Sequence, residues 1–287
     1  MRAGLFITSR CINAEGPVWD EDTQTLYFID VEAGNIFSYK ESTLNKISVG
    51  EKIGTMALCR NSNRYIVGAQ SGIYLLDPLT GEKMRLCDPE SNLPENRFND
   101  GKADPSGRFL AGTLSMVPYL KPRAALYSLS KETEVRKIIP DVGLANGLTW
   151  SADGSVFYFI DTDRNTVSRY DYDKETGDIA NGRVIIKVPD FMGAPDGMTI
   201  DLEGYLWVAL WGCKSVTRWD PKKGELIDRI EVPAQNVSSC CFGGKNMDEL
   251  FITTASQDTD LKKYPLAGNV FIVRPGVAGS KTYKYDD

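Results

Sequence analysis

The stretch that decides the fold reads Asn96-Arg97-Phe98-Asn99-Asp100-Gly101-Lys102-Ala103-Asp104-Pro105-Ser106-Gly107-Arg108-Phe109-Leu110-Ala111-Gly112-Thr113. It opens with a dense polar cluster, continues through a turn with Asp-Pro-Ser-Gly at its tip, and ends in a short apolar run typical of a strand. The turn and the apolar run recur along the chain, whereas the polar opening changes each time. This pattern predicts a repeated scaffold that carries one composite site.

The repeat consists of an apolar segment, a turn with Asp or Asn and Gly, and a second apolar segment, which a third strand follows in most copies. Its copies occupy residues 16–30, 55–69, 96–113, 146–161, 196–209 and 238–253. A spacing of roughly 45 residues matches the length of propeller blades. We therefore predict an all-β, six-bladed β-propeller in which residues 1–287 form a single domain and Ala3 to Thr8 supply the closing strand of the last blade. A β-sandwich is the alternative, but it would not explain six similar units.

The amino-acid composition excludes several classes of protein. The chain has 287 residues, ordinary apolar and charged contents of 42% and 25%, and a net charge of −6, which offers no basic patch for nucleic acid. It contains no apolar run long enough to span a membrane and no signal-peptide pattern at its N-terminus. The six cysteines include no C-x-x-C pair, which favours reduced thiols and a cytoplasmic location. We expect a small-molecule substrate, no nucleic-acid or membrane partner, and a monomer or weak dimer.

The chain contains no histidine. This absence excludes Ser-His-Asp and Cys-His mechanisms, histidine-based zinc sites and any imidazole general base. Catalysis would have to depend on carboxylates, amides, Lys, Arg, Tyr, Cys or a bound metal ion.

Polar residues recur where the first strand of several repeats begins. In a propeller this strand runs beside the central channel, so its opening residues converge at one mouth. Four repeats supply oxygen ligands there, whereas the second and sixth supply only Thr55 and Ser238; the candidate ligands are Glu15, Asn99 with Asp100, Asn146, and Asp196. Carboxylate and amide oxygens without a softer ligand suit a hard divalent cation such as Ca²⁺, Mg²⁺ or Mn²⁺. The alternative is that each residue only caps a turn.

Two further groups of residues have a structural interpretation. The repeated turn residues, such as Asp104, Gly107, Asp201 and Gly204, fit hairpin geometry, because Asp and Gly tolerate positive φ. Most tryptophans are expected to pack in the core or between blades. Trp211 follows its strand and is a candidate for a pocket rim.

Four ordered motifs resemble the SMP-30/gluconolactonase/LRE family, which includes regucalcin, gluconolactonases and luciferin-regenerating enzymes. They are Ala14-Glu15-Gly16-Pro17-Val18-Trp19, Asn96-Arg97-Phe98-Asn99-Asp100-Gly101-Lys102, Ala145-Asn146-Gly147-Leu148 and Pro195-Asp196-Gly197-Met198. The resemblance spans essentially the whole chain and is a stronger indication of family than of substrate.

The resemblance implies specific roles. Glu15, Asn146 and Asp196 would be the metal ligands, and Asp196 would also be the general base. Arg97 and Asn99 would contact the substrate, with Asp100 close by. The implied cofactor is one divalent cation, with Ca²⁺ first and Zn²⁺, Mg²⁺ or Mn²⁺ as alternatives. The implied activity is the hydrolysis of lactones.

One departure from the family pattern concerns the substrate. After Gly112-Thr113, regucalcin-like members carry acidic residues that help to hold the sugar, whereas this chain reads Leu114-Ser115-Met116-Val117. Tyr119, Lys121 and Arg123 in the following loop are candidates for replacing those contacts. Two alternatives to a lactonase therefore stay open: a luciferin-regenerating-type or organophosphate hydrolase on the same metal site, and a calcium-binding regulatory protein with vestigial activity.

Overall fold

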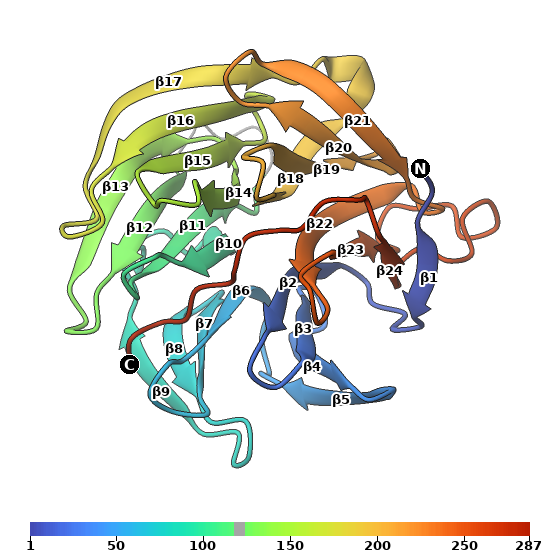
Figure 1. Ribbon diagram of the computed structural model, residues 1–287. Coiled ribbons are helices and arrows are strands. Elements are labelled where there is room, and N and C mark those ends of the chain that lie inside the picture. The colour runs from blue at the N-terminus through green and yellow to red at the C-terminus, as the bar shows by residue number, and fades with distance from the viewer. Residues whose placement is uncertain (118–123) are drawn as a thin grey trace.

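The computed structural model describes residues 1–117 and 124–287 and shows six four-stranded antiparallel sheets arranged as blades around a central axis (Figure 1). The predicted six-bladed β-propeller is thus confirmed. Among the described residues the helical content is a single 3-10 turn, η1 (Asp190–Met192). No helix in the described part of the chain is long and apolar enough to cross a bilayer.

Each blade runs from an inner strand at the axis to an outer strand at the rim. Blades one to three are β2 (Ala14–Asp20), β3 (Thr25–Asp30), β4 (Asn35–Lys40), β5 (Thr43–Ser48); β6 (Ile53–Leu58), β7 (Tyr65–Ala69), β8 (Gly72–Leu76), β9 (Lys83–Cys87); and β10 (Asn96–Ala103), β11 (Phe109–Ser115), β12 (Ala124–Leu129), β13 (Val135–Val142). Blades four and five are β14 (Ala145–Trp150), β15 (Val156–Asp161), β16 (Thr166–Tyr172), β17 (Ile179–Lys187); and β18 (Ala194–Ile200), β19 (Leu206–Trp211), β20 (Ser215–Asp220), β21 (Glu225–Glu231). Blade six is β22 (Asn236–Gly243), β23 (Glu249–Ala255), β24 (Val270–Val273) and β1 (Gly4–Ile7).

Burial falls from the axis to the rim. Every residue of β6, β14 and β22 is buried, whereas β5 and β21 are largely exposed. Inner strands are covered by neighbouring blades on both faces, so they lose the polar–apolar alternation of a half-exposed strand. Polar side chains on these strands are therefore removed from water and need partners inside the protein.

The repeated Asp-x-x-Gly turns have the expected structural role. The Asp104 carboxylate accepts hydrogen bonds from the backbone N–H groups of Ser106 and Arg108, and Gly107 has φ of 85°. Asp201 does the same for Glu203 and Tyr205. These carboxylates form the hairpins and do not belong to the central site.

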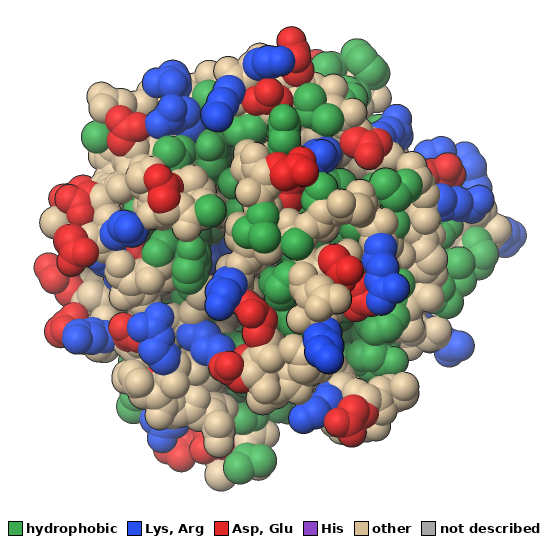
Figure 2. All heavy atoms as spheres, in the orientation of Figure 1, with side chains coloured by type: hydrophobic (Ala, Val, Ile, Leu, Met, Phe, Trp, Pro, Cys, Tyr) green, Lys and Arg blue, Asp and Glu red, His purple; other side chains and the backbone are tan. Residues whose placement is uncertain are grey.

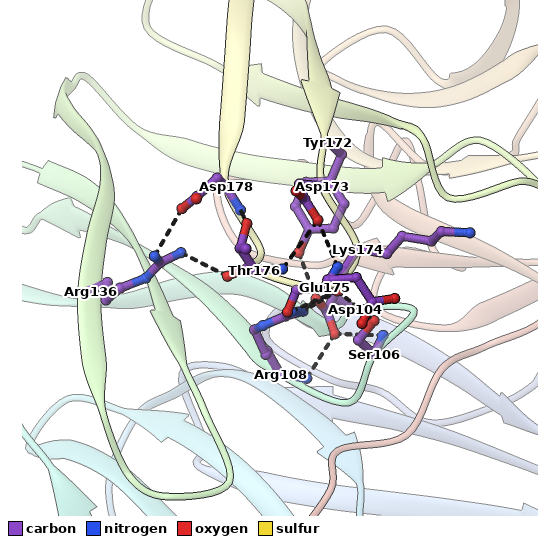
Figure 3. Close-up of polar contacts among 10 residues, drawn as sticks. All are labelled: Asp104, Ser106, Arg108, Arg136, Tyr172, Asp173, Lys174, Glu175, Thr176 and Asp178. Carbon is purple, nitrogen blue, oxygen red and sulfur yellow. Dashed lines mark hydrogen bonds and ion pairs between the residues drawn. The ribbon is translucent and has the colours of Figure 1, made fainter.

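A polar clasp joins blades three and four at one of these turns (Figure 3). Asp104 Oδ2 accepts hydrogen bonds from Arg108 Nη1 at 2.7 Å and from the Tyr172 hydroxyl at 2.6 Å. Arg108 Nη2 also donates to the carbonyl oxygens of Lys174 and Glu175, both at 2.6 Å. Because Asp104 is fully buried and paired with a guanidinium, the clasp contributes to the fixed angle between these blades.

The carboxyl-terminal segment, residues 274–287, crosses one face of the propeller in front of the inner strands (Figure 1). We call it the C-terminal strap. Its contacts reach every blade: Gly279 N–H to Met247 O, Ser280 N–H to Ile200 O, Tyr283 against Trp150, Asp286 N–H to Gly107 O, Tyr285 N–H to Leu58 O, and Lys284 Nζ to Asp20. On this face, acidic and basic side chains are interspersed (Figure 2). The sequence did not predict the strap, because its residues lack the pattern of the repeat.

Tyr285 anchors the strap between blades two and three. Its ring is 1% exposed, its backbone pairs with Leu58 and Arg60, and its hydroxyl donates to Ser130 O at 3.1 Å. We predict that Tyr285→Ala lowers the free energy of unfolding by about 3 kcal/mol, the effect of deleting a buried aromatic ring.

Urea unfolding measures this change. Tyr285→Phe, which removes only the hydroxyl, should cost about 1 kcal/mol. Leu79→Ala is the control, since Leu79 is 90% exposed, and it should leave the stability unchanged. An unfolding free energy for Tyr285→Ala equal to that of Leu79→Ala would contradict an anchoring role.

Candidate functional site

The site begins with an irregularity that all six inner strands share. The strand pairing shifts in register near the start of each one, between Glu15 and Val18, Ile53 and Thr55, Phe98 and Gly101, Asn146 and Leu148, Pro195 and Met198, and Val237 and Ser239. Such shifts redirect side chains away from the regular alternation of the strand. The predicted ligands occupy these positions, so the fold directs them to one end of the channel.

Four of these side chains are buried there together. Glu15 is 9% exposed, Asp100 6%, Asn146 4% and Asp196 7%. Glu15 and Asp100 each accept a hydrogen bond from the following glycine N–H, at 2.7 and 2.6 Å, and Asn146 Nδ2 donates to Thr162 Oγ1 at 3.1 Å. Asp100 Oδ2 and Asn146 Oδ1 have no hydrogen-bond partner. Unpaired buried oxygens are rare in proteins and indicate a missing donor or cation.

The three carboxyl groups perturb one another. Burial raises the pKa of Glu15 well above its usual range, and the nearby Asp196 and Asp100 raise it further. Burial and then Asp100 raise the pKa of Asp196, although a hydrogen bond from Asn146 acts in the opposite direction. Burial also raises the pKa of Asp100, against the lowering effect of Lys102. The three carboxyl groups are therefore close enough for the charge of one to affect the protonation of another.

The donor set fits a divalent cation only if an amide takes part. Within residues 1–117 and 124–287, no three Asp, Glu, Cys or His side chains converge closely enough to hold a metal ion. Glu15 and Asp196 would supply two carboxylates, and the unpaired amide oxygen of Asn146 would complete the set. All three are hard oxygen donors, which suits calcium. The assignment of these three as ligands stays a prediction.

The second and sixth blades use the equivalent position differently. Thr55 Oγ1 donates to Gly101 O at 2.7 Å, and Ser238 Oγ donates to Ala14 O at 2.5 Å. Both hydroxyls are fully buried and join neighbouring blades. Asn99, a predicted substrate contact, also makes such a link, with Nδ2 donating to Ala145 O at 2.9 Å.

Arg97 lies beside the carboxylates at the start of β10. Its Nη1 donates to Phe98 O at 2.8 Å and to Asn99 Oδ1 at 3.1 Å, which fixes the guanidinium. Burial lowers the pKa of Arg97, while Glu32 and Glu15 act in the opposite direction. Arg97 and Phe98 also line a groove of about 350 Å³. Arg97 thus lines the groove and also interacts with the buried Glu15, although Glu15, Asp100 and Asp196 do not line the groove themselves.

Glu90 lines the same groove, and sequence reasoning missed it. Its carboxylate is 7% exposed and accepts hydrogen bonds from Asn96 Nδ2 at 2.9 Å, Thr113 Oγ1 at 3.1 Å and the Tyr127 hydroxyl at 3.0 Å. It comes from the loop before β10, outside the repeated unit, so no periodic signal marks it. A carboxylate therefore lies next to Thr113, although the residues after Thr113 are not acidic.

The remaining candidates are less informative. Leu114 and Ser115 are half-buried at the end of β11, and Val117 is exposed. Tyr119, Lys121 and Arg123 lie outside the described residues. Trp211 is half-buried at the end of β19, where its carbonyl packs against Gly193 after η1; its role at a pocket rim stays a prediction. None of the six cysteines forms a disulfide.

Comparison with known proteins gives a consistent result. A model of the SMP-30/Gluconolactonase/LRE-like region matches residues 13–256. Human regucalcin is 36% identical over 289 aligned residues, which cover 97% of this chain and 96% of the relative. A luciferin-regenerating enzyme has a similar structure, with a TM-score of 0.91, 31% identity and coverage of 99% of this chain and 100% of that one. Regucalcin from Agrobacterium tumefaciens, described as a calcium-binding protein, has a TM-score of 0.92, 26% identity and coverage of 99% and 98%.

The raised carboxyl pKa values predict how the stability of the cation-free protein depends on pH. In the pH window that opens at about 4, the ordinary pKa of unfolded Asp and Glu, the folded state should bind more protons than the unfolded state, because the folded pKa values of Glu15 and Asp196 lie above the unfolded ones. The free energy of unfolding should therefore fall as pH rises through this window. The chain has no histidine that would add its own transition there.

Urea unfolding in a chelating buffer at several pH values checks this sign. Glu15→Gln should reduce the slope and raise the stability at the upper end of the window. Glu175→Gln is the matched control, because Glu175 is exposed on a turn, and it should keep the slope of the unmodified chain. A stability that is flat or increases with pH would contradict the interpretation of the cluster.

Proposed function

The chain belongs to the SMP-30/gluconolactonase/LRE-like family, and we propose that it is a divalent-cation-dependent hydrolase of lactones and related carboxylic esters. One observation supports the proposal above all. Three buried carboxylates and the unpaired oxygen of Asn146 lie together at one end of the channel, with the Arg97 guanidinium beside them. A propeller that only binds other proteins has no need to bury such a cluster.

In this proposal Glu15, Asn146 and Asp196 hold the cation. Ca²⁺ is the first choice because all donors are hard oxygens, with Zn²⁺, Mg²⁺ and Mn²⁺ as alternatives. When bound, the cation supplies Lewis acidity that polarises the ester carbonyl and stabilises negative charge on its oxygen. The regucalcin of Agrobacterium tumefaciens, described as calcium-binding, is a supporting parallel.

The side chains of the protein perform the other steps. Asp196, which a bound cation would keep ionised despite its burial, accepts the proton of the attacking water, a role that falls to a carboxylate because the chain lacks histidine. Arg97 and Asn99 orient the substrate, and the planar guanidinium can hold two substrate oxygens at once. Asp100 lies close by and adds to the negative potential of the pocket.

A second candidate is a hydrolase of a different ester, of the luciferin-regenerating or organophosphate type. The residues from Leu114 to Val117 favour it, because they supply none of the carboxylates expected to hold a sugar. The 31% identity to a luciferin-regenerating enzyme over nearly the whole chain agrees. The similarity to regucalcin also supports the alternative that the chain is a calcium-binding regulatory protein. Chelation, followed by re-addition of each cation with a lactone, aryl-ester and organophosphate panel, distinguishes these candidates.

Asp196→Asn tests the cation site, since it replaces a carboxylate with an amide of the same shape. We expect calcium affinity to fall by at least about 100-fold, because losing even an outer partner of a ligand costs 10- to 100-fold. Hydrolysis should be lost with it. Asp258→Asn, at an exposed loop position, should change neither quantity. Calcium binding by Asp196→Asn at the affinity of the unmodified chain, measured by titration calorimetry, would rule out the assignment.

Arg97→Ala tests the substrate contact. Loss of one charge-assisted hydrogen bond should lower kcat/KM by roughly 10- to 150-fold, corresponding to about 1.5–3 kcal/mol, while calcium affinity stays unchanged. Arg97→Lys should restore only part of the activity, since an ammonium lacks the planar fork. If Arg97→Ala retains full activity on the whole panel, the hydrolase proposal fails and the regulatory protein becomes the better account.

A further inference from the structure

Lys102 belongs to neither the candidate ligands nor the substrate contacts, yet its side chain reaches into the central channel. It lies on β10, two residues after Asp100, and its Nζ donates to Met198 O at 2.6 Å. Met198 is on β18, so the lysine connects blade three to blade five across the intervening blade four. A side chain fixed in this way places a positive charge at a defined point on the axis.

A small chamber beside Lys102 has mixed polar and apolar walls. It offers about 50 Å³ to water-sized molecules, and its lining combines polar residues (Lys102, Thr149, Thr199, Ser280 and Lys281) with apolar ones such as Met56, Trp150 and Phe242. This volume has room for roughly three to five water molecules. The ammonium of Lys102 thus has one fixed carbonyl partner and space for water, which offsets part of its desolvation.

The field of Lys102 reaches one member of the carboxylate cluster, Asp100, which in turn acts on Glu15 and Asp196. The lysine lowers the pKa of Asp100, and it lowers those of the Cys240 and Cys241 thiols on blade six, in each case against the larger effect of burial. Its hydrogen bond goes to a carbonyl rather than to a carboxylate, so its effect on the cluster acts through space. Such effects are strong in the low dielectric of a protein interior.

We propose that Lys102 is a built-in counter-ion of the carboxylate cluster that sets its affinity for the divalent cation, an inference that rests on the proposed function. Glu15, Asp100 and Asp196 carry three negative charges when ionised. Lys102 and Arg97 offset part of this negative charge before a divalent cation binds. Without Lys102 the site would be more negative by one charge and would attract the cation more strongly.

The experiment is a direct titration of the cation-free protein with calcium, followed by calorimetry. Lys102→Met removes the charge and keeps most of the stem, and we expect it to bind calcium about tenfold more tightly. Lys102→Arg keeps the charge and should bind within about twofold of the unmodified chain. Lys281→Met is the matched control, because Lys281 lines the same chamber from the strap, and it should also leave the affinity unchanged.

The thermal unfolding of each variant supplies a second measurement. Lys102→Met should lower Tm without calcium and show a larger rise in Tm on calcium addition than the unmodified chain. If its affinity is unchanged or weaker, the counter-ion role is wrong. If the variant cannot be recovered folded even in millimolar calcium, the role is also wrong, because the bond to Met198 O would then be what matters. If the unmodified chain itself binds no divalent cation, the proposed function fails instead.

Discussion

The close approach of the six inner strands around the channel is the constraint on which the rest of the structure depends. Two glycines show how tight it is: a Cβ at Gly147 would lie 2.6 Å from Asp196 O, and one at Gly197 would lie 2.0 Å from Ser239 Oγ. No larger residue fits either place without moving the neighbouring blade. Each of these glycines directly follows a candidate ligand, Asn146 or Asp196. The close packing of the inner strands, which closes the ring, therefore also brings the polar side chains of Asn146 and Asp196 together.

Ring closure also explains the unusual electrostatics. Glu15, Asp100 and Asp196 come from three different blades, so none could be placed near the others by local structure alone. Once the ring is closed they are buried together, and burial disfavours their ionised forms. Arg97 and Lys102 are two basic side chains that act on members of this cluster.

The sequence predicts the parts of the molecule that repeat. Six copies of one unit specify six blades, and residues at the equivalent position of each copy should meet, which is why the repeat pattern selects Glu15, Asn99 with Asp100, Asn146 and Asp196. Only the family resemblance narrows the predicted metal ligands to Glu15, Asn146 and Asp196. Glu90 and Tyr285 cannot be selected from the repeat pattern, because each belongs to a segment outside the repeat and acquires its role through contacts with distant strands. The register shifts are likewise invisible in the sequence, since they depend on pairing between strands rather than on composition.

The same structural position serves two purposes in this ring. In blades two and six a hydroxyl at or next to that position links one blade to the next, through Thr55 and Ser238. In blade four the side chain of Asn146 points its oxygen at no donor, and Asp100 in blade three leaves Oδ2 equally unpaired. An unpaired buried oxygen costs about 1–3 kcal/mol, so each such position weakens the ring that a hydroxyl would have strengthened. The candidate site therefore requires that some blades lack the hydroxyl hydrogen bond that links a blade to its neighbour. The blades that retain it, with the strap across the opposite face, hold the ring closed around the oxygens that remain free.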